Sequence, residues 1–284
     1  MPTNAVVLFI SPAGSTRHVA GVIEDAAVAS GAHVVTLDLK DANRKHDFTE
    51  TIQKIGTQGI LFVGSPVYRD MAVPPVMRFI ESLPRVDGIP VAPFVTWGGA
   101  FSGVALWQMG QALTECGFSL VGGARVLGRH SMMWRTAEPV GAGHPDDDDD
   151  RLVADWVQTL FQRFQEGTLR PMAPAALDDH PPEHSASARA RLELPWTVIP
   201  KTVNEEACTE CGICRDECPT AAIVLDPTPH FTDACFDCFN CVRLCPEEAI
   251  EPAVAYKDIE KMILNRVRTF NETPPTRVYR NDSS

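Results

Sequence analysis

The chain is short of positive charge and of long hydrophobic runs. Its 25 Lys and Arg stand against 37 Asp and Glu, a formal net charge of −12, which argues against a nucleic-acid partner. No stretch approaches the roughly 20 apolar residues of a membrane-spanning helix. The apolar run 5–10 is short and no basic leader precedes it, so we expect neither a membrane span nor a signal peptide.

Common nucleotide-binding and catalytic motifs are also missing. A loop of small residues, 11–16, follows the apolar run, but it lacks the Gly-Lys-Ser/Thr ending of a Walker A motif. It has one glycine rather than the three of the dinucleotide-binding fingerprint. No nucleophile–base pair and no catalytic dyad stand out, so we assign no catalytic residue.

Cysteine, by contrast, follows a strict pattern. Eight of the nine cysteines fall into two runs with the spacing C-x2-C-x2-C-x3-C-P. The first run is Cys208, Cys211, Cys214, Cys218 and Pro219, and the second is Cys235, Cys238, Cys241, Cys245 and Pro246. Bacterial ferredoxins use this spacing to hold two 4Fe-4S clusters, and the fourth cysteine of each run binds the other cluster.

Other uses of these cysteines are weaker. A zinc site needs two C-x2-C pairs and no third cysteine two residues on, and a disulfide framework needs an oxidising compartment. Residues 201–256 resemble a bacterial two-cluster ferredoxin over their whole length. The resemblance implies one cluster on Cys208, Cys211, Cys214 and Cys245, and the other on Cys235, Cys238, Cys241 and Cys218. Cysteines needed as thiolates indicate a cytoplasmic protein.

The first half predicts alternating strands and helices. Strand candidates lie at 4–10, 34–39, 59–64, 91–96 and 120–126, and helical patterns lie near 16–30, 74–83, 104–116 and 151–166. This alternation favours an open parallel sheet with helices on both faces. Ligands of such sheets bind beyond the carboxyl ends of the strands.

The small-residue loop after the first strand resembles the FMN-phosphate loop of flavodoxins, Ser/Thr-x-Thr-Gly-x-Thr. Ser11, Gly14 and Thr16 match that motif, whereas Ala13 replaces its usual threonine and Ser15 is the nearest substitute hydroxyl. A loop that opens a helix N-terminus favours an anion such as phosphate. The resemblance implies a flavodoxin-like, doubly wound, five-stranded parallel α/β sheet, followed by a small α+β ferredoxin domain.

Two further loops follow the third and fourth strands. They carry Pro66, Val67 and Tyr68 in the first and Trp97, Gly98, Gly99 and Phe101 in the second. Flavodoxin-like proteins hold the flavin ring between the corresponding loops, so these residues are candidate FMN-binding residues. The plainer interpretation is that the aromatics pack the core and the glycines turn the chain. Arg129 and His130 are candidates for the same rim, although a surface role is favoured for them.

The remaining segments are interpreted as structural. We expect a flavodoxin-like domain at 1–167, a proline-rich connector at 168–200, the ferredoxin domain at 201–256, and a helix and tail at 257–284, with the last fourteen residues loosely ordered. The acidic run 146–150 is expected to open a helix rather than to bind a cation. His180 and His184 have a helical metal spacing, but Pro181 and Pro182 argue against a helix there.

The chain as a whole is similar to the fused flavodoxin–ferredoxin proteins of bacteria and archaea, and this resemblance implies electron transfer. FMN exchanges electrons in pairs or singly, whereas each cluster passes one. No nicotinamide-binding domain is present in the sequence, so we expect another redox protein or enzyme as the electron donor or acceptor. Two alternatives stay open: an FMN-dependent reductase acting on a small substrate with the clusters feeding the flavin, and a redox sensor or scaffold.

Overall fold

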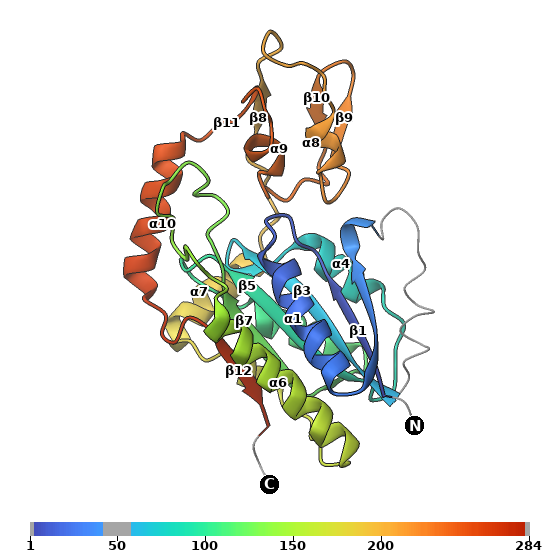
Figure 1. The fold of residues 1–284 in the computed structure, drawn as a ribbon. Coiled ribbons are helices and arrows are strands. Elements are labelled where there is room, and N and C mark those ends of the chain that lie inside the picture. Colours follow the sequence, from blue (N-terminus) through green and yellow to red (C-terminus); the bar gives the residue numbers. More distant parts are fainter. Residues whose placement is uncertain (1–2, 42–57, 282–284) are drawn as a thin grey trace.

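The first part of the chain forms a doubly wound α/β sheet. The computed structural model describes residues 3–41 and 58–281. Five parallel strands lie in the order β2-β1-β3-β5-β7 (Figure 1). Their bounds are β1 Thr3–Phe9, β2 Ala32–Asp38, β3 Gly59–Tyr68, β5 Pro90–Trp97 and β7 Gly122–Leu127. This is the flavodoxin order, so the predicted fold class is confirmed.

Helices cover both faces because the central strands are apolar on both sides. One face packs on α1 (Ser15–Ala29) and α6 (Asp147–Gln165), where Phe62 meets Trp156 edge to face at 5.8 Å between ring centres. The other face packs on α4 (Pro74–Ser82) and α5 (Ala105–Glu115). Two short strands also pair with the central strands: β4 (Met71–Ala72) runs antiparallel to β3, and β6 (Ser119–Leu120) runs parallel to β5.

A sixth strand from the end of the chain joins this sheet. β12 (Arg277–Arg280) runs antiparallel to β7, and the backbone oxygen of Tyr279 accepts a 3.1 Å hydrogen bond from Trp156 Nε1. The expectation of a loosely ordered tail was therefore wrong for 277–280, and residues 282–284 lie outside the described part of the chain. The segment Arg-Val-Tyr-Arg is too short to show a period of its own, and the open edge of β7 is what orders it.

The connector and the segment after the ferredoxin domain also form helices. They are η2 (Pro174–Leu177), α7 (Pro182–Leu192) and α10 (Tyr256–Phe270). Pro181 and Pro182 argued against a helix at His180 and His184, but α7 begins at Pro182 and includes His184. Pro182 occupies the first helical position, where no N–H is needed. Phe101 stacks on Phe270 at 3.9 Å, which holds α10 against the sheet domain.

The ferredoxin domain lies over the carboxyl ends of the parallel strands (Figure 1). It contains β8 (Lys201–Val203), α8 (Ile213–Asp216), β9 (Ile223–Leu225), β10 (Pro229–Phe231), α9 (Asn240–Arg243) and β11 (Ile250–Pro252). The strands form two antiparallel pairs, β10 with β9 and β11 with β8. Among the helices of the described residues, none is both long and apolar enough to span a bilayer.

Candidate functional site

The eight motif cysteines gather around two small cavities. Cys208, Cys211, Cys214 and Cys245 line one cavity, and Cys218, Cys235, Cys238 and Cys241 line the other. Each set takes three cysteines from one run and the last from the other run. We call these cavities the outer and the inner cysteine site, because the inner one faces the sheet domain. The structure thus brings together the two sets that the ferredoxin resemblance implies.

The inner and outer sites suit a cluster better than a single metal ion. A tetrahedral zinc ion with bonds of about 2.3 Å would bring its sulfurs to about 3.8 Å of one another. Across residues 3–41 and 58–281, three possible ligand atoms within 4.8 Å of one another occur only at His144, Asp146 and Asp149. The cysteine sulfurs of either site are therefore too far apart to bind one zinc ion together. Backbone N–H groups also donate to cysteine sulfur, from Ala222 to Cys218 at 3.2 Å and from Ala249 to Cys245 at 3.3 Å. Such bonds stabilise thiolate ligands.

The two sites differ in what surrounds them. Between its first two cysteines the outer site has Thr209 and Glu210, and Cys211 is exposed. The inner site has Phe236 and Asp237 there, 2% and 4% exposed. Burial raises the pKa of the Cys238 thiol above its usual range, so a bare thiolate would be costly and a bound metal would offset that cost. The outer site therefore meets solvent and the inner site meets protein.

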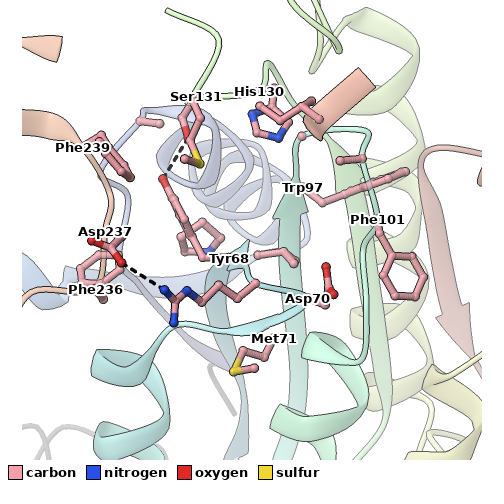
Figure 2. A pocket seen from close by; sticks show the side chains of 18 of the residues that line it. Tyr68, Asp70, Met71, Trp97, Phe101, His130, Ser131, Phe236, Asp237 and Phe239 are labelled. Atoms are coloured by element: carbon pink, nitrogen blue, oxygen red, sulfur yellow. Dashed lines mark hydrogen bonds and ion pairs between the residues drawn. The ribbon is translucent and has the colours of Figure 1, made fainter. Parts of the chain in front are cut away.

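A large cavity lies between the sheet domain and the inner cysteine site. Its volume is about 640 Å³, within the range of small-molecule and cofactor sites. The walls come from the carboxyl ends of β3 and β5, from the loops after β1, β3, β5 and β7, from the connector at 194–199 and from α10. Pro66, Val67, Tyr68 and Trp97, which the sequence placed in loops, therefore belong to the strand ends. The ferredoxin domain closes one side with Phe236, Asp237 and Phe239, which face Tyr68 (Figure 2).

Most of the predicted flavin residues reach this cavity. Those lining it are Ala13, Ser15, Thr16, Pro66, Val67, Tyr68, Trp97, Gly98 and Phe101. Three others shape the loops without lining it. Ser11 accepts a 2.9 Å hydrogen bond from the backbone N–H of Arg17. Gly14 and Gly99 have φ of 97° and 77°, which glycine adopts without strain.

Three of the predicted aromatic residues, Tyr68, Trp97 and Phe101, line the cavity and differ in their contacts. Tyr68 is buried, which raises the pKa of its phenol, and its hydroxyl lies 3.0 Å from Ser131 Oγ. Trp97 stands opposite Tyr68 across the cavity (Figure 2), and its Nε1 donates to the carbonyl of Pro275 at 2.8 Å. Phe101 already stacks on Phe270. Tyr68 and Trp97 are therefore the better placed pair for holding a flat ring.

Among the described residues that line the cavity, two have a buried side-chain nitrogen atom without a hydrogen-bond partner. These atoms are Nδ1 of His130 and Nε1 of Trp196. Burial and the nearby Arg266 lower the pKa of His130 to about 4, so its imidazole is neutral at neutral pH. Buried polar atoms are normally satisfied, and a polar ligand in the cavity would supply the missing partner. The sequence favoured a surface role for His130, and only the folding of α10 over it reveals its burial.

A buried carboxylate joins the loop after β3 to the helices α7 and α10. Asp70 forms ion pairs with Arg191 of α7 and Arg266 of α10. Asp70 and its neighbour Arg69 both have left-handed backbone, with φ of 70° and 54°, and such strain persists where the surroundings fix it. Asp70 therefore links the loop after β3 to α7 and α10, which both contribute residues to the cavity wall.

We expect Asp70→Asn to lower the free energy of unfolding by about 2–3 kcal/mol, because it leaves two arginines facing a neutral group. Asp148→Asn is a suitable control, since Asp148 pairs with Arg151 on the exposed surface and such pairs contribute about 1 kcal/mol or less. Urea unfolding followed by tryptophan fluorescence measures both variants. Equal free energies of unfolding for the two variants would contradict a stabilising role for the ion pairs of Asp70.

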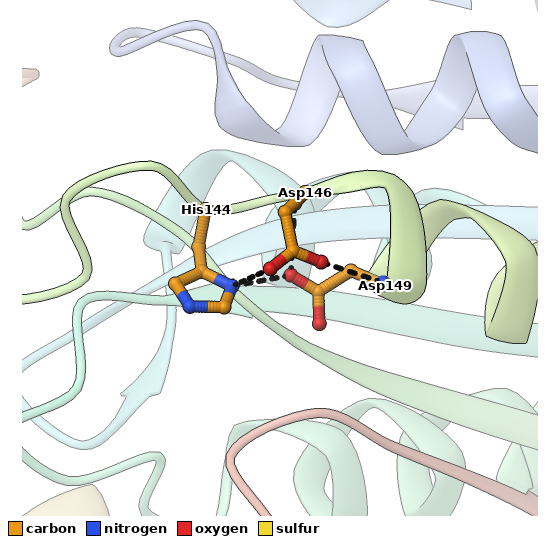
Figure 3. A group of neighbouring side chains, drawn as sticks. All are labelled: His144, Asp146 and Asp149. Atoms are coloured by element: carbon orange, nitrogen blue, oxygen red, sulfur yellow. Dashed lines mark hydrogen bonds and ion pairs between the residues drawn. The ribbon is translucent and has the colours of Figure 1, made fainter.

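The acidic run 146–150 caps a helix, as the sequence indicated. Asp146 accepts from the backbone N–H groups of Asp148 and Asp149, and Asp149 accepts in return from that of Asp146. His144 Nδ1 lies 2.6 Å from Asp149 (Figure 3). Although these side chains converge, Asp146 Oδ1 and Asp149 Oδ2 already accept the hydrogen bonds of the capping box. The cluster is explained by helix α6.

Comparison with known proteins supports the ferredoxin interpretation. A family model for a 4Fe-4S binding domain matches residues 201–224. The ferredoxin-type methylamine utilization protein MauM of Methylophilus methylotrophus is 31% identical over 115 residues, 36% of this chain and 48% of that protein, so the chain spans about half of that relative. Ferredoxin-1 of Chlorobaculum tepidum is 42% identical over 53 residues, 16% of this chain and 86% of the ferredoxin.

Among solved structures, a flavodoxin from the domain Archaea is similar over 57% of this chain and 99% of its own, at 16% identity and a TM-score of 0.44. The strand order and the paired cysteine runs define an iron–sulfur protein with a flavodoxin-like sheet domain. Through its C-terminal segment the chain belongs to the 4Fe-4S ferredoxins. The chain thus joins a sheet domain with the flavodoxin strand order to a 4Fe-4S ferredoxin segment.

Proposed function

We propose that this protein carries single electrons between FMN in the large cavity and two 4Fe-4S clusters in the cysteine sites, to or from a separate redox partner. One observation carries the proposal. The second cysteine run supplies a wall of the same cavity that the flavodoxin-like loops form. Two redox sites that share a wall suit electron exchange within the chain.

The cavity suits FMN on three grounds. Its phosphate would lie at the N-terminus of α1, where Ala13 and Ser15 line the cavity and backbone N–H groups with the helix dipole favour an anion. The ring would lie between Tyr68 and Trp97. The neutral imidazole of His130 lines the same cavity and adds a polar ring to its wall. When bound, the flavin links two-electron to one-electron chemistry.

The arrangement orders the redox centres. The ring of Phe236 meets Tyr68 at 5.9 Å between centres, and Phe236 is adjacent to Cys235 of the inner site. The inner cluster would thus be the flavin's neighbour. The outer site carries the exposed Cys211 and would be the point of exchange with a partner. Phe236 and Phe239, which are 2% and 1% exposed, keep solvent away from the space between the inner site and the cavity.

Selective reduction tests the internal step. Light-driven reduction of the flavin in the anaerobic holoprotein, followed by absorbance, should be succeeded by bleaching of the clusters without any added partner. Independent reduction of flavin and clusters, with no exchange between them, would refute the proposed wiring. A wild-type protein that takes up no flavin on titration would refute the flavin part alone.

The partner is expected to present a basic surface. Residues 201–256 contain eleven acidic against three basic residues, a local balance of −8, and exposed Glu210 and Asp216 lie near the outer site. Oxidation of the reduced protein by a cationic cobalt hexaammine complex should therefore slow severalfold between 0.01 and 0.15 M ionic strength, as the Debye length falls from about 30 to about 8 Å. Ferricyanide, an anion, is the control and should not slow. The same salt response for both acceptors would contradict an acidic exit face.

A second function, an FMN-dependent reductase, is favoured by one feature. Beyond the predicted ring position the cavity continues to Trp196, whose Nε1 has no partner, and this leaves room for a small substrate. Steady reduction of a quinone or nitroaromatic compound by the isolated protein, at rates unaffected by added redox proteins, would establish this alternative. Activity that appears only with a redox protein present supports the carrier.

A further inference from the structure

The two halves of the ferredoxin domain are related by an internal repeat. Corresponding cysteines lie 27 residues apart, as in Cys208 and Cys235. The strands correspond as well: Val203 pairs with Ile250 in one half, and Phe231 pairs with Ile223 in the other. A cluster in either half would therefore meet similar backbone, and any difference in potential must come from side chains that break the repeat.

One such difference is a buried lysine. Two residues before Val203 and Phe231, β8 begins with Lys201 and β10 begins with Pro229. Lys201 lines the inner cysteine site, whereas Pro229 lines the outer one. The repeat thus places an ammonium group beside one site and an apolar ring beside the other.

The ammonium group of Lys201 is held close to a metal ligand. Its Nζ donates to Cys235 Sγ at 3.6 Å, to Asp237 Oδ1 at 2.9 Å and to the carbonyl of Ile199 at 3.0 Å. The Lys201 side chain is only 1% exposed, and Nζ lies 5.0 Å from the ring centre of Phe239. Because water has little access, the charge acts on the site at low effective dielectric.

The local charge balance is positive. Asp237 offsets Lys201 in part, but its second oxygen also faces Arg69 at 3.5 Å, so the three side chains carry a net charge of +1. Near the outer site Arg215 is half exposed and paired with Asp216, and solvent screens such a charge. The inner site alone has a buried cation on a ligand sulfur among the described ion pairs and hydrogen bonds.

We propose that Lys201 raises the reduction potential of the inner cluster above that of the outer cluster. The inference rests on the proposed function, since it requires both clusters. Reduction adds one electron, and hence one negative charge, to a cluster. A buried ammonium and an N–H···S bond stabilise that charge. A single electron in the ferredoxin domain then resides at the cluster beside the flavin cavity, and the partner exchanges electrons through the cluster of lower potential.

Redox titration of the anaerobically prepared holoprotein by spin-resonance spectroscopy tests this. Wild type should show two midpoint potentials. In Lys201→Met the higher one should fall, with a decrease of about tenfold or more in the reduction equilibrium constant, while the lower one stays. Lys201→Arg keeps the charge and should resemble wild type. If Lys201→Met retains about eight iron and both potentials are unchanged, the inference is overturned.

The reciprocal variant keeps the test decisive if Lys201→Met loses its inner cluster. Pro229→Lys places an ammonium at the corresponding position of the outer site and should raise the lower potential, while Pro229→Met should not. Unchanged potentials in Pro229→Lys would then refute the role of charge at this position. Failure of the wild type to bind two clusters on reconstitution refutes the proposed function instead, and iron analysis distinguishes the two results.

Discussion

Replacement of Cys218 by serine is expected to remove the inner cluster, although Cys218 belongs to the first run. Its sulfur lines the same cavity as Cys235, Cys238 and Cys241. A serine hydroxyl is a poor ligand for a cluster held by thiolates, so iron should fall from about eight to about four per chain. Iron analysis and spin-resonance spectra of the anaerobic protein measure this.

Two further variants make the result specific. Cys235→Ser should give the same residual spectrum as Cys218→Ser, because both would lose the inner cluster. Cys214→Ser should give the other spectrum, because Cys214 lines the outer site. Cys116→Ser, remote from both runs, should keep all iron. Matching spectra for Cys218→Ser and Cys214→Ser would mean that each run holds its own cluster.

Ser15→Asp is expected to abolish flavin binding. Ser15 is the first residue of α1 and lines the cavity, so an aspartate there would face the phosphate of FMN bound as proposed. Two like charges about 4 Å apart repel by about 4 kcal/mol at an effective dielectric of 20, which weakens binding about a thousandfold. Fluorescence titration of the apoprotein with FMN measures the dissociation constant.

The design separates binding from folding. The negative charge of an aspartate in the first helical turn interacts favourably with the helix dipole, so the Ser15→Asp protein should be at least as stable as wild type. Ser15→Asn has the same size without the charge and should bind FMN within about tenfold of wild type. Tight FMN binding by the Ser15→Asp protein would mean that the phosphate binds elsewhere, and would refute the proposed phosphate-binding role of the loop 11–16.

The sequence predicted the parts whose signals are local. Cysteine spacing and buried parallel strands each have a pattern that a few residues carry, so both domains and the fold class follow from it. The cavity walls contributed by Trp196 and Arg266 do not. Both residues come from segments that acquire a role only when they fold against distant loops. The ion pairs of Asp70 could not be predicted either, because its two arginine partners lie 121 and 196 residues away in the sequence.

The burial of His130 shows the same limit from another side. In the sequence it is one polar residue in a loop of mixed character. In the fold it lies near Arg266 of α10 and packs closely on Gly98 of the loop after β5, where an added Cβ would lie 2.7 Å from the His130 ring. Polar residues that line a closed cavity look like surface residues until the element that closes the cavity is known.

The strand β12 changes the relation between the two domains. Because the chain returns to the edge of β7 after the ferredoxin domain, the ferredoxin is an insertion within the sheet domain and has two covalent attachments to it. A protease cut at 193–200 would leave the cluster domain tethered through α10 and the last strand. Ribosomal synthesis also completes the sheet only after the cysteine segment has emerged, so cluster loading and closure of the sheet fall in the same stage of biogenesis.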